Sequence, residues 1–331
     1  MKKKVAVLFA LSLLCISLTA YADSYSMLGF VNASTSDRVH LRSAPRSDAP
    51  SLGLYFTGTP VINLWGGNDQ WMEVMIGSEK GYMYKKMLVD ATEEHNPSVK
   101  WKKAVVHASG WVNLLSAPSL NAPIVSKVPD ESTVAVLGET KDRWCYVKVG
   151  NAYGYIMSRY LKVSKDLYHI EKQGSLPLPI CLPAQCYFSS GAGAWSTQMV
   201  ILPDGSFWGY YHDADMGINS DKYPKGTLYE CSFTGTFSDI RRINETEYQM
   251  KVDCVQDFGI KNSETVYNDT LVITTGSYGL ANKEIFSVFL PGTPHFSLPE
   301  EYLWQYMNYA VDHKKTIGLF GHSGQAAWVI D

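Results

Sequence analysis

Short runs of alternating apolar and polar residues, separated by Gly, Pro, Asn and Asp, extend over most of this chain. Clear examples are residues 229–237 and 248–254, where every second side chain is apolar or small. Alternation with this period predicts β-strands that bury one face. A helical period occurs near the C-terminus, in residues 297–311, where a capping pattern precedes an apolar stripe. The pattern therefore predicts an all-β protein with one late helix.

Part of the chain repeats itself at a constant spacing. Residues 39–45 (VHLRSAP) recur as residues 112–118 (VNLLSAP), 73 positions later, and Trp71 recurs as Trp144 at the same spacing. Internal repetition of this kind marks domain boundaries. We expect a first unit at 26–90, a polar linker at 91–103 and a second unit at 104–164.

The repeated segment resembles the bacterial SH3 domain. Residues 39–45, Trp71 and the closing Gly81-Tyr82-Met83 carry this resemblance, and the second copy has Leu115 where Arg42 stands in the first. The resemblance implies two tandem small SH3-like barrels that bind cell-wall polymer, peptidoglycan or a surface protein. Trp71 and Trp144 are then candidate ligand platforms, and framework packing is the alternative interpretation.

Residues 186–331 are expected to form a larger antiparallel β domain after a Pro-rich linker at 165–185. Asp204-Gly205 lies between two alternating runs and predicts a tight hairpin. Gly193-Ala194-Trp195 loosely resembles the lipocalin and avidin class of up-and-down barrels, which implies a barrel able to enclose one small ligand. A filled sandwich is the other architecture that this pattern allows. The whole segment also resembles a C-terminal module found with bacterial SH3 repeats in secreted proteins. Ligand-binding candidates in this domain are Trp195, Tyr210 and His212.

The N-terminus predicts export. Three lysines at positions 2–4 precede an apolar stretch, and Ala20-Tyr21-Ala22 offers a cleavage site, so residues 1–22 are expected to be a signal peptide. The protein would then be secreted, periplasmic or held at the cell surface, with no transmembrane anchor. The chain has 29 basic and 32 acidic residues, a formal net charge of −3, which gives no reason to expect nucleic acid as a partner.

Five cysteines follow the predicted signal peptide, and export makes disulfides feasible. If the strands at 229–237 and 247–254 pair so that Phe237 faces Tyr248, Cys231 faces Cys254, and either a disulfide or two close thiols results. A loop disulfide between Cys181 and Cys186 is a second candidate. Cys145 is expected to face inward as an inert, unpaired thiol.

One polar segment has candidate metal chemistry. Asp213, Asp215, Asn219 and Asp221 present oxygen ligands at alternate spacing, which suits calcium, although Gly217 stands where a ligand is usual. The alternative is a solvated loop stabilised by Asp and Asn turns. No other cofactor is predicted.

The leading hypothesis is an exported, non-catalytic binding protein in which tandem SH3-like modules attach to cell wall or surface polymer. Its C-terminal β domain would bind a ligand or partner of unknown identity. The alternative is a cell-wall-acting hydrolase with acid–base residues drawn from His212, Asp213 and Asp215. None of the cysteines precedes a helical pattern, which a thiol nucleophile at a helix N-terminus would need, so no catalytic residue is assigned.

Overall fold

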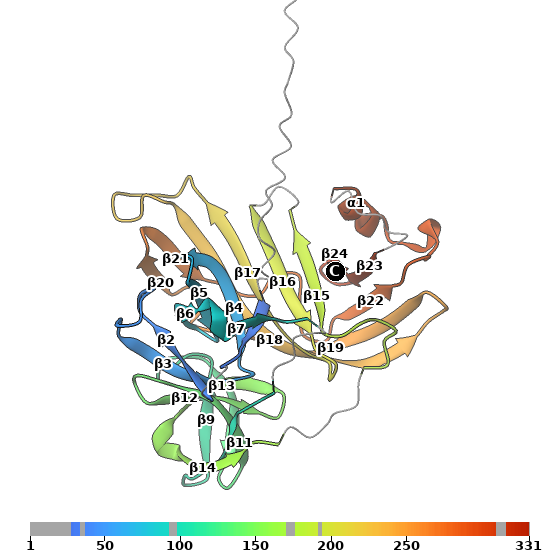
Figure 1. Cartoon of the computed structure of the whole chain (residues 1–331). Helices are drawn as coiled ribbons and strands as arrows, with labels where there is room; N and C mark the ends of the chain where they lie inside the picture. Colours follow the sequence, from blue (N-terminus) through green and yellow to red (C-terminus); the bar gives the residue numbers. More distant parts are fainter. Residues whose placement is uncertain are drawn as a thin grey trace, which may run out of the picture.

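The predicted all-β fold class is confirmed. A computed structural model describes residues 28–33, 37–92, 98–169, 176–190, 194–308 and 316–330, and these residues form two large sheets and one α-helix (Figure 1). The predicted signal peptide lies outside the described residues. Within the described ranges, no helix is long and apolar enough to cross a membrane.

The first sheet contains two units with the same order of elements. The first unit comprises β1 (Leu28–Val31), β2 (Arg38–Arg42), β3 (Ser51–Phe56), β4 (Pro60–Gly67), β5 (Trp71–Ile76), β6 (Glu79–Tyr84), η1 (Lys85–Met87) and β7 (Leu88–Asp90). The second unit comprises β8 (Lys102–Val106), β9 (Trp111–Leu115), β10 (Ile124–Pro129), β11 (Thr133–Thr140), β12 (Trp144–Val149), β13 (Ala152–Met157), η2 (Ser158–Tyr160) and β14 (Leu161–Leu167). Each element from β9 to β14 starts 73 residues after its counterpart from β2 to β7, as the first pair shows (111 − 38 = 73).

The two units are joined edge to edge into one curled sheet of 14 strands. The joint is the antiparallel pair β3–β11, in which Tyr55 lies opposite Gly138 and Gly53 lies opposite Thr140. A Cβ atom added at Gly138 would collide with the Tyr55 ring, so the glycine permits this close approach. The apolar faces of both units contribute to a single core cluster, which includes the buried thiol of Cys145.

The C-terminal domain is a closed barrel of eight strands, so the sandwich alternative is wrong. Its strands are β15 (Ala184–Ser189), β16 (Trp195–Ile201), β17 (Ser206–Asp215), β18 (Thr227–Arg242), β19 (Glu247–Asp257), β22 (Ile285–Phe289), β23 (Ile317–Gly321) and β24 (Ala326–Ile330). They pair antiparallel in this order, and β24 pairs with β15 to close the ring. The predicted hairpin around Asp204-Gly205 is confirmed as β16–β17.

Large side chains fill the barrel interior. Phe207, Phe233 and Trp328 are fully buried members of its core cluster. A Cβ atom at Gly209 would collide with Phe233, and one at Gly235 would collide with Phe207. The two glycines therefore make room for the rings, as expected for an eight-stranded barrel whose lumen is only wide enough for side chains.

An inserted hairpin, β20 (Glu264–Tyr267) and β21 (Thr270–Thr274), projects from the barrel between β19 and β22. Asn268 and Asp269 both adopt positive φ, which these two residue types tolerate, and the chain reverses at this point. β21 pairs parallel with the start of β18.

The predicted late helix is α1 (Glu300–Asn308). Its Tyr302 packs against Phe289 and Phe320 on the outside of the barrel, with ring centroids 5.1 and 6.2 Å apart. The helix therefore covers the outer face of β22–β24, at the opposite side of the barrel from the two units (Figure 1).

The predicted register of β18 and β19 is wrong, and so is the Cys231–Cys254 pairing. Phe237 lies opposite Val252, and Cys254 lies opposite Thr236. Cys231 instead lies opposite Tyr211 on β17. The register differs from the predicted one by four residues at Phe237 and by five beyond the bulge between Thr236 and Phe237, so Cys254 lies on the exposed face. Alternation alone does not locate such a bulge.

The predicted disulfides are not formed. Cys145, Cys181, Cys186, Cys231 and Cys254 are all free thiols. The Cys181–Cys186 bridge fails because Cys186 points into the barrel core from β15, whereas Cys181 is exposed.

Both units pack against the outside of the barrel. In the first unit, the Phe30 ring lies 4.9 Å from the Trp208 ring of β17, and the Ser232 hydroxyl donates to the Gly77 carbonyl at 2.6 Å. In the second unit, the Tyr146 ring lies 5.9 Å from Phe258. These contacts place one face of each unit under the cover of the barrel.

Candidate functional site

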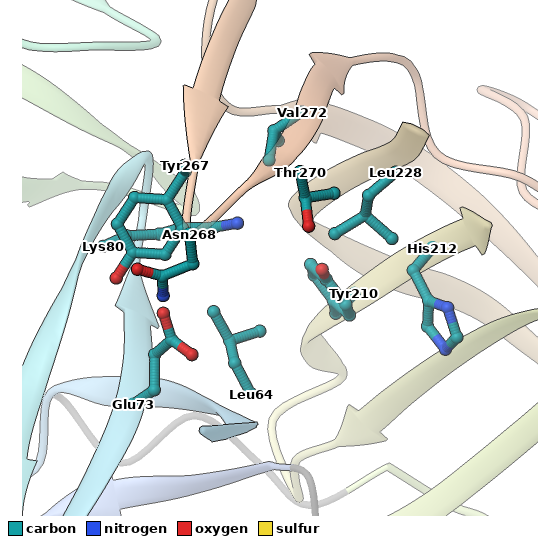
Figure 2. A pocket seen from close by; sticks show the side chains of 10 residues that line it. All are labelled: Leu64, Glu73, Lys80, Tyr210, His212, Leu228, Tyr267, Asn268, Thr270 and Val272. Carbon is teal, nitrogen blue, oxygen red and sulfur yellow. The ribbon is translucent and has the colours of Figure 1, made fainter. Parts of the chain in front are cut away.

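A cleft of about 360 Å³ lies where the first unit meets the barrel and its inserted hairpin (Figure 2). β5 and β6 supply one wall, β17 and β18 supply another, and the β20–β21 hairpin supplies the third. The lining residues are Leu64, Glu73, Lys80, Tyr210, His212, Leu228, Tyr267, Asn268, Thr270 and Val272.

A buried ion pair crosses the junction beside this cleft. Lys80 Nζ lies 2.6 Å from Glu230 Oε2, and the Tyr210 hydroxyl donates to the same oxygen at 2.7 Å. Burial raises the pKa of Tyr210, and the Glu230 carboxylate raises it further. The Tyr210 hydroxyl therefore stays protonated and acts as a donor to Glu230 at physiological pH.

A second carboxylate, Glu73, faces the cleft from β5. Its side chain points toward Tyr267 and Asn268 (Figure 2), and the residue is only 9% exposed. Its Oε1 atom receives no hydrogen bond from any described residue. Burial raises the pKa of Tyr267, and hydrogen bonds with Glu73 and Tyr82 raise it further, so the phenol stays protonated. The Tyr267 hydroxyl lies 3.5 Å from the Tyr82 hydroxyl, to which it donates. Tyr82 completes the group, since its hydroxyl lies 3.4 Å from Asn268 Nδ2.

His212 lies at the far end of the same cleft (Figure 2). Its Nε2 atom is 2.9 Å from the Ser196 hydroxyl, and its ring stacks on Tyr210 at a centroid distance of 5.9 Å. Burial lowers the pKa of His212, while Asp213 and Glu230 act in the opposite direction. The structure thus brings together two sequence candidates, Tyr210 and His212.

A second concave surface is lined entirely by residues of the second unit. This groove of about 500 Å³ is lined by exposed apolar residues, among them Trp111 at 56% and Leu120 at 75% exposure. The candidate Trp144 also lines it, although its ring is largely buried. Lys127 Nζ lies 4.5 Å from the centroid of the Trp111 ring, and Arg159 is among the residues that line the groove. The groove therefore combines aromatic faces with cationic donors.

The other two tryptophan candidates pack locally. Trp71 makes an edge contact with Tyr84 at 5.6 Å, and Trp195 makes edge contacts with Phe188 and Tyr278 at 4.9 and 5.1 Å. Neither ring is among the lining residues of the cleft or the groove. Their contacts fit the framework interpretation.

Polar side chains of the acidic loop after β17 form hydrogen bonds within the loop itself. Asp215 Oδ1 accepts hydrogen bonds from the backbone N–H groups of Gly217 and Ile218, at 2.8 and 3.3 Å. Asn219 donates to the Met216 carbonyl at 2.9 Å. These are turn contacts of the solvated-loop interpretation. The calcium prediction for Asp213, Asp215, Asn219 and Asp221 stays a prediction.

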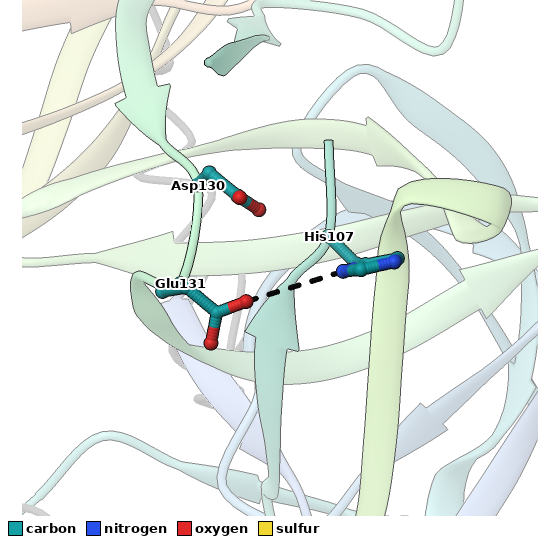
Figure 3. A group of neighbouring side chains, drawn as sticks. All are labelled: His107, Asp130 and Glu131. Atoms are coloured by element: carbon teal, nitrogen blue, oxygen red, sulfur yellow. Dashed lines mark ion pairs between the residues drawn. The ribbon is translucent and has the colours of Figure 1, made fainter. Parts of the chain in front are cut away.

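A different trio has ligand-type atoms close together. His107, Asp130 and Glu131 lie at the surface of the second unit, and His107 Nδ1 is 4.0 Å from a Glu131 oxygen (Figure 3). Asp130 Oδ1 already accepts the Ala108 backbone N–H at 2.8 Å. His107 and Glu131 are exposed, so this trio is adequately explained as a surface ion pair beside a capped turn.

Sequence reasoning missed the charged residues of the cleft and the apolar residues of the groove. Glu73 and Lys80 are replaced by Tyr146 and Tyr153 in the second unit, 73 positions later. Trp111 and Leu120 stand where the first unit has Arg38 and Ser47. A comparison of the two copies could have identified these residues, because they occupy the positions at which one copy is charged or polar and the other is aromatic or aliphatic.

A family model described as a bacterial SH3 domain matches residues 110–162. The match covers most of the second unit and all of the groove-lining residues except Ala108 and Ser109. No relative among curated proteins matches the chain.

Two solved structures are similar to parts of the chain. NlpC2 from Trichomonas vaginalis is 19% identical with a TM-score of 0.22, over 42% of this chain and 48% of that one. NlpC1 from Trichomonas vaginalis is 16% identical with a TM-score of 0.23, over 59% of this chain and 86% of that one. The chain thus spans about half the length of NlpC2, and TM-scores this low carry no argument about function.

Proposed function

We propose that this chain is an exported, non-catalytic binding protein that attaches to cell-wall or surface polymer through the groove of its second unit. The observation that carries the proposal is the exposed apolar groove around Trp111 and Leu120 on the unit that matches a bacterial SH3 domain. Exposed aromatic and aliphatic side chains grouped in a concavity are typical of binding surfaces.

The first unit is proposed to be a second SH3-like copy with a different task. Its elements follow the same order and spacing, but Arg38 and Ser47 replace the apolar groove residues Trp111 and Leu120. Polymer attachment is therefore assigned to the second unit. The calcium-binding loop and the predicted signal peptide remain proposals that rest on sequence pattern.

Retention on purified peptidoglycan tests the polymer proposal. Trp111→Ala and Leu120→Ala should each reduce the bound fraction severalfold, because each removes apolar area from the groove. The matched control is Phe296→Ala, which truncates a side chain that is 90% exposed and lies outside the groove. Equal retention of all variants, or no retention of the unaltered protein, would refute the polymer proposal.

The hydrolase alternative requires that the side chain of His212 and that of Asp213 or Asp215 lie together in one catalytic site. His212 lines the cleft, whereas the two aspartates are not among its lining residues. Asp213 neighbours His212 on β17, and adjacent strand residues point to opposite faces. Zymography on cell-wall material is the direct test, and a clearing zone would favour the hydrolase.

A further inference from the structure

We propose that the cleft between the first unit and the barrel binds a small ligand that carries a primary ammonium group on an apolar body. This site is separate from the groove of the second unit. It deepens the binding function proposed above, by naming a ligand class for the C-terminal domain.

Glu73 is the residue that calls for a ligand donor. It is nine-tenths buried and lines the cleft. Tyr267 is hydrogen-bonded to its carboxylate, but the Oε1 atom accepts no hydrogen bond from the described residues. A buried carboxylate oxygen without a donor is costly. The chain also makes space for this side chain, because a Cβ atom at Gly66 on β4 would collide with the Glu73 carboxylate.

The charges at the cleft favour a cation. Lys80 is the cationic side chain that lines it, and its ammonium is committed to Glu230 at 2.6 Å. Glu230 receives a further hydrogen bond from Tyr210. Glu73 is therefore the carboxylate whose charge has no cationic partner in this wall, and an ammonium group would supply both the charge and the missing donor.

The rest of the wall favours an apolar body on the same ligand. Three apolar side chains line the cleft beside the ring of Tyr267: Leu64 from β4, Leu228 from β18 and Val272 from β21. The Lys80 ammonium already lies 5.5 Å from the centroid of this ring, so the ring contributes contact area for the apolar body of the ligand. The volume of about 360 Å³ lies at the lower end of small-molecule sites, so the ligand is small.

The second unit provides a comparison, because its equivalent face also packs against the barrel domain but carries no charged residues at these two positions. At the positions of Glu73 and Lys80 it has Tyr146 and Tyr153, and Tyr146 packs on Phe258 of the barrel domain. An apolar contact of this kind stabilises a junction without burying charge, whereas buried ions carry a desolvation cost. The charged residues of the first unit are therefore better explained by ligand recognition than by docking of the unit.

Calorimetric titration of the purified protein with two probes of nearly equal shape tests the proposal. The probes are 2-phenylethylamine, which is an ammonium ion at neutral pH, and 2-phenylethanol, which is neutral. We expect the amine to bind about tenfold or more tightly than the alcohol, the factor expected from one charge-assisted hydrogen bond. Glu73→Gln should remove this preference, and Glu139→Gln, the same change at an exposed position of the second unit, should keep it.

Three outcomes would overturn the proposal: no binding of the amine, equal binding of amine and alcohol, or an unchanged preference in Glu73→Gln. The comparison of the two probes on the unaltered protein stands even if Glu73→Gln does not fold. Thr270→Trp, which fills the cleft from β21, then serves as the second variant and should abolish amine binding. Trp111→Ala should keep amine binding, and Glu73→Gln should keep retention on peptidoglycan, so the two proposals fail independently.

Discussion

Lys80 Nζ lies 2.6 Å from Glu230 Oε2, and this ion pair links the first unit to the barrel across 150 positions of sequence. Both side chains are largely buried. The pair therefore fixes how the two domains meet at the edge of the cleft.

Breaking this pair should destabilise the protein. Lys80→Met leaves the Glu230 carboxylate buried without its cation, and we expect the free energy of unfolding to fall by about 3 kcal/mol. The double variant Lys80→Met/Glu230→Gln should recover part of the loss because neither charge remains. Guanidinium denaturation followed by circular dichroism measures both, and Arg46→Met is the control, since the Arg46–Asp48 pair is 64% and 73% exposed. A loss as small as that of the control would contradict the argument.

Thiol labelling should separate the cysteines into two classes. Burial raises the pKa of Cys145 to about 12 and also raises the pKa values of Cys186 and Cys231, so these thiols should resist iodoacetamide in the folded protein. Cys181 and Cys254 are exposed and should react. Mass spectrometry of labelled peptides at pH 8 gives the readout. Rapid labelling of Cys231, or a mass gain on reduction, would show that the thiols are arranged differently.

Alkaline pH should destabilise the fold through its buried tyrosines. Burial raises the pKa values of Tyr146 and Tyr155 above their ordinary value near 10. The unfolded chain therefore loses these protons first as the pH rises. Stability from this source is complete below pH 9, and above pH 10 it falls by up to about 1.4 kcal/mol per pH unit for each such tyrosine.

Urea midpoints at pH 8, 10 and 11 measure this effect. Tyr155→Phe should make the decline with pH shallower, whatever it does to stability at pH 8 through loss of the hydroxyl contacts with Ile76 and Ser78. An identical slope for Tyr155→Phe and the unaltered protein would rule out Tyr155 as a source.

The acidic loop offers a test between turn and cation site. If Asp215 serves to close the turn onto Gly217 and Ile218, Asp215→Asn should melt like the unaltered protein, because the amide oxygen accepts the same hydrogen bonds. Asp215→Ala should lose about 1 kcal/mol. Melting with and without calcium chloride completes the test, and a rise in Tm with calcium that Asp215→Asn abolishes would instead favour the calcium prediction.

Local features of the fold were readable from the sequence because they depend on neighbours along the chain. Alternation predicts the strands, the inward-facing Cys145 and the hairpin at Asp204-Gly205, and all three are confirmed. The register of β18 on β19 could not be predicted, because the bulges near Phe237 and Ser238 change it by one residue part-way along the ladder, and alternation does not locate a bulge.

The cleft could not be derived in the same way. Alternation correctly places Glu73 on the face of β5 opposite Met72 and Val74, which suggests solvent exposure. That face is covered by β17 and β18 of the barrel, which begin more than 130 positions further along the chain (206 − 73 = 133), and only this packing turns a surface carboxylate into a buried one. Tyr210 and His212 were identified as candidates for their chemistry, but their partner Glu230 was not, because the pairing of β17 with β18 was not predicted.

The pairing of β3 with β11 bears on how attachment would work in space. Backbone hydrogen bonds fuse the two units, and the Lys80–Glu230 ion pair and the Tyr146–Phe258 contact hold them against the barrel. The groove around Trp111 therefore cannot rotate relative to the barrel as it would on a flexible tether. A strand of polymer captured there would orient the whole molecule, and the mouth of the Glu73 cleft would face a constant direction with respect to the surface.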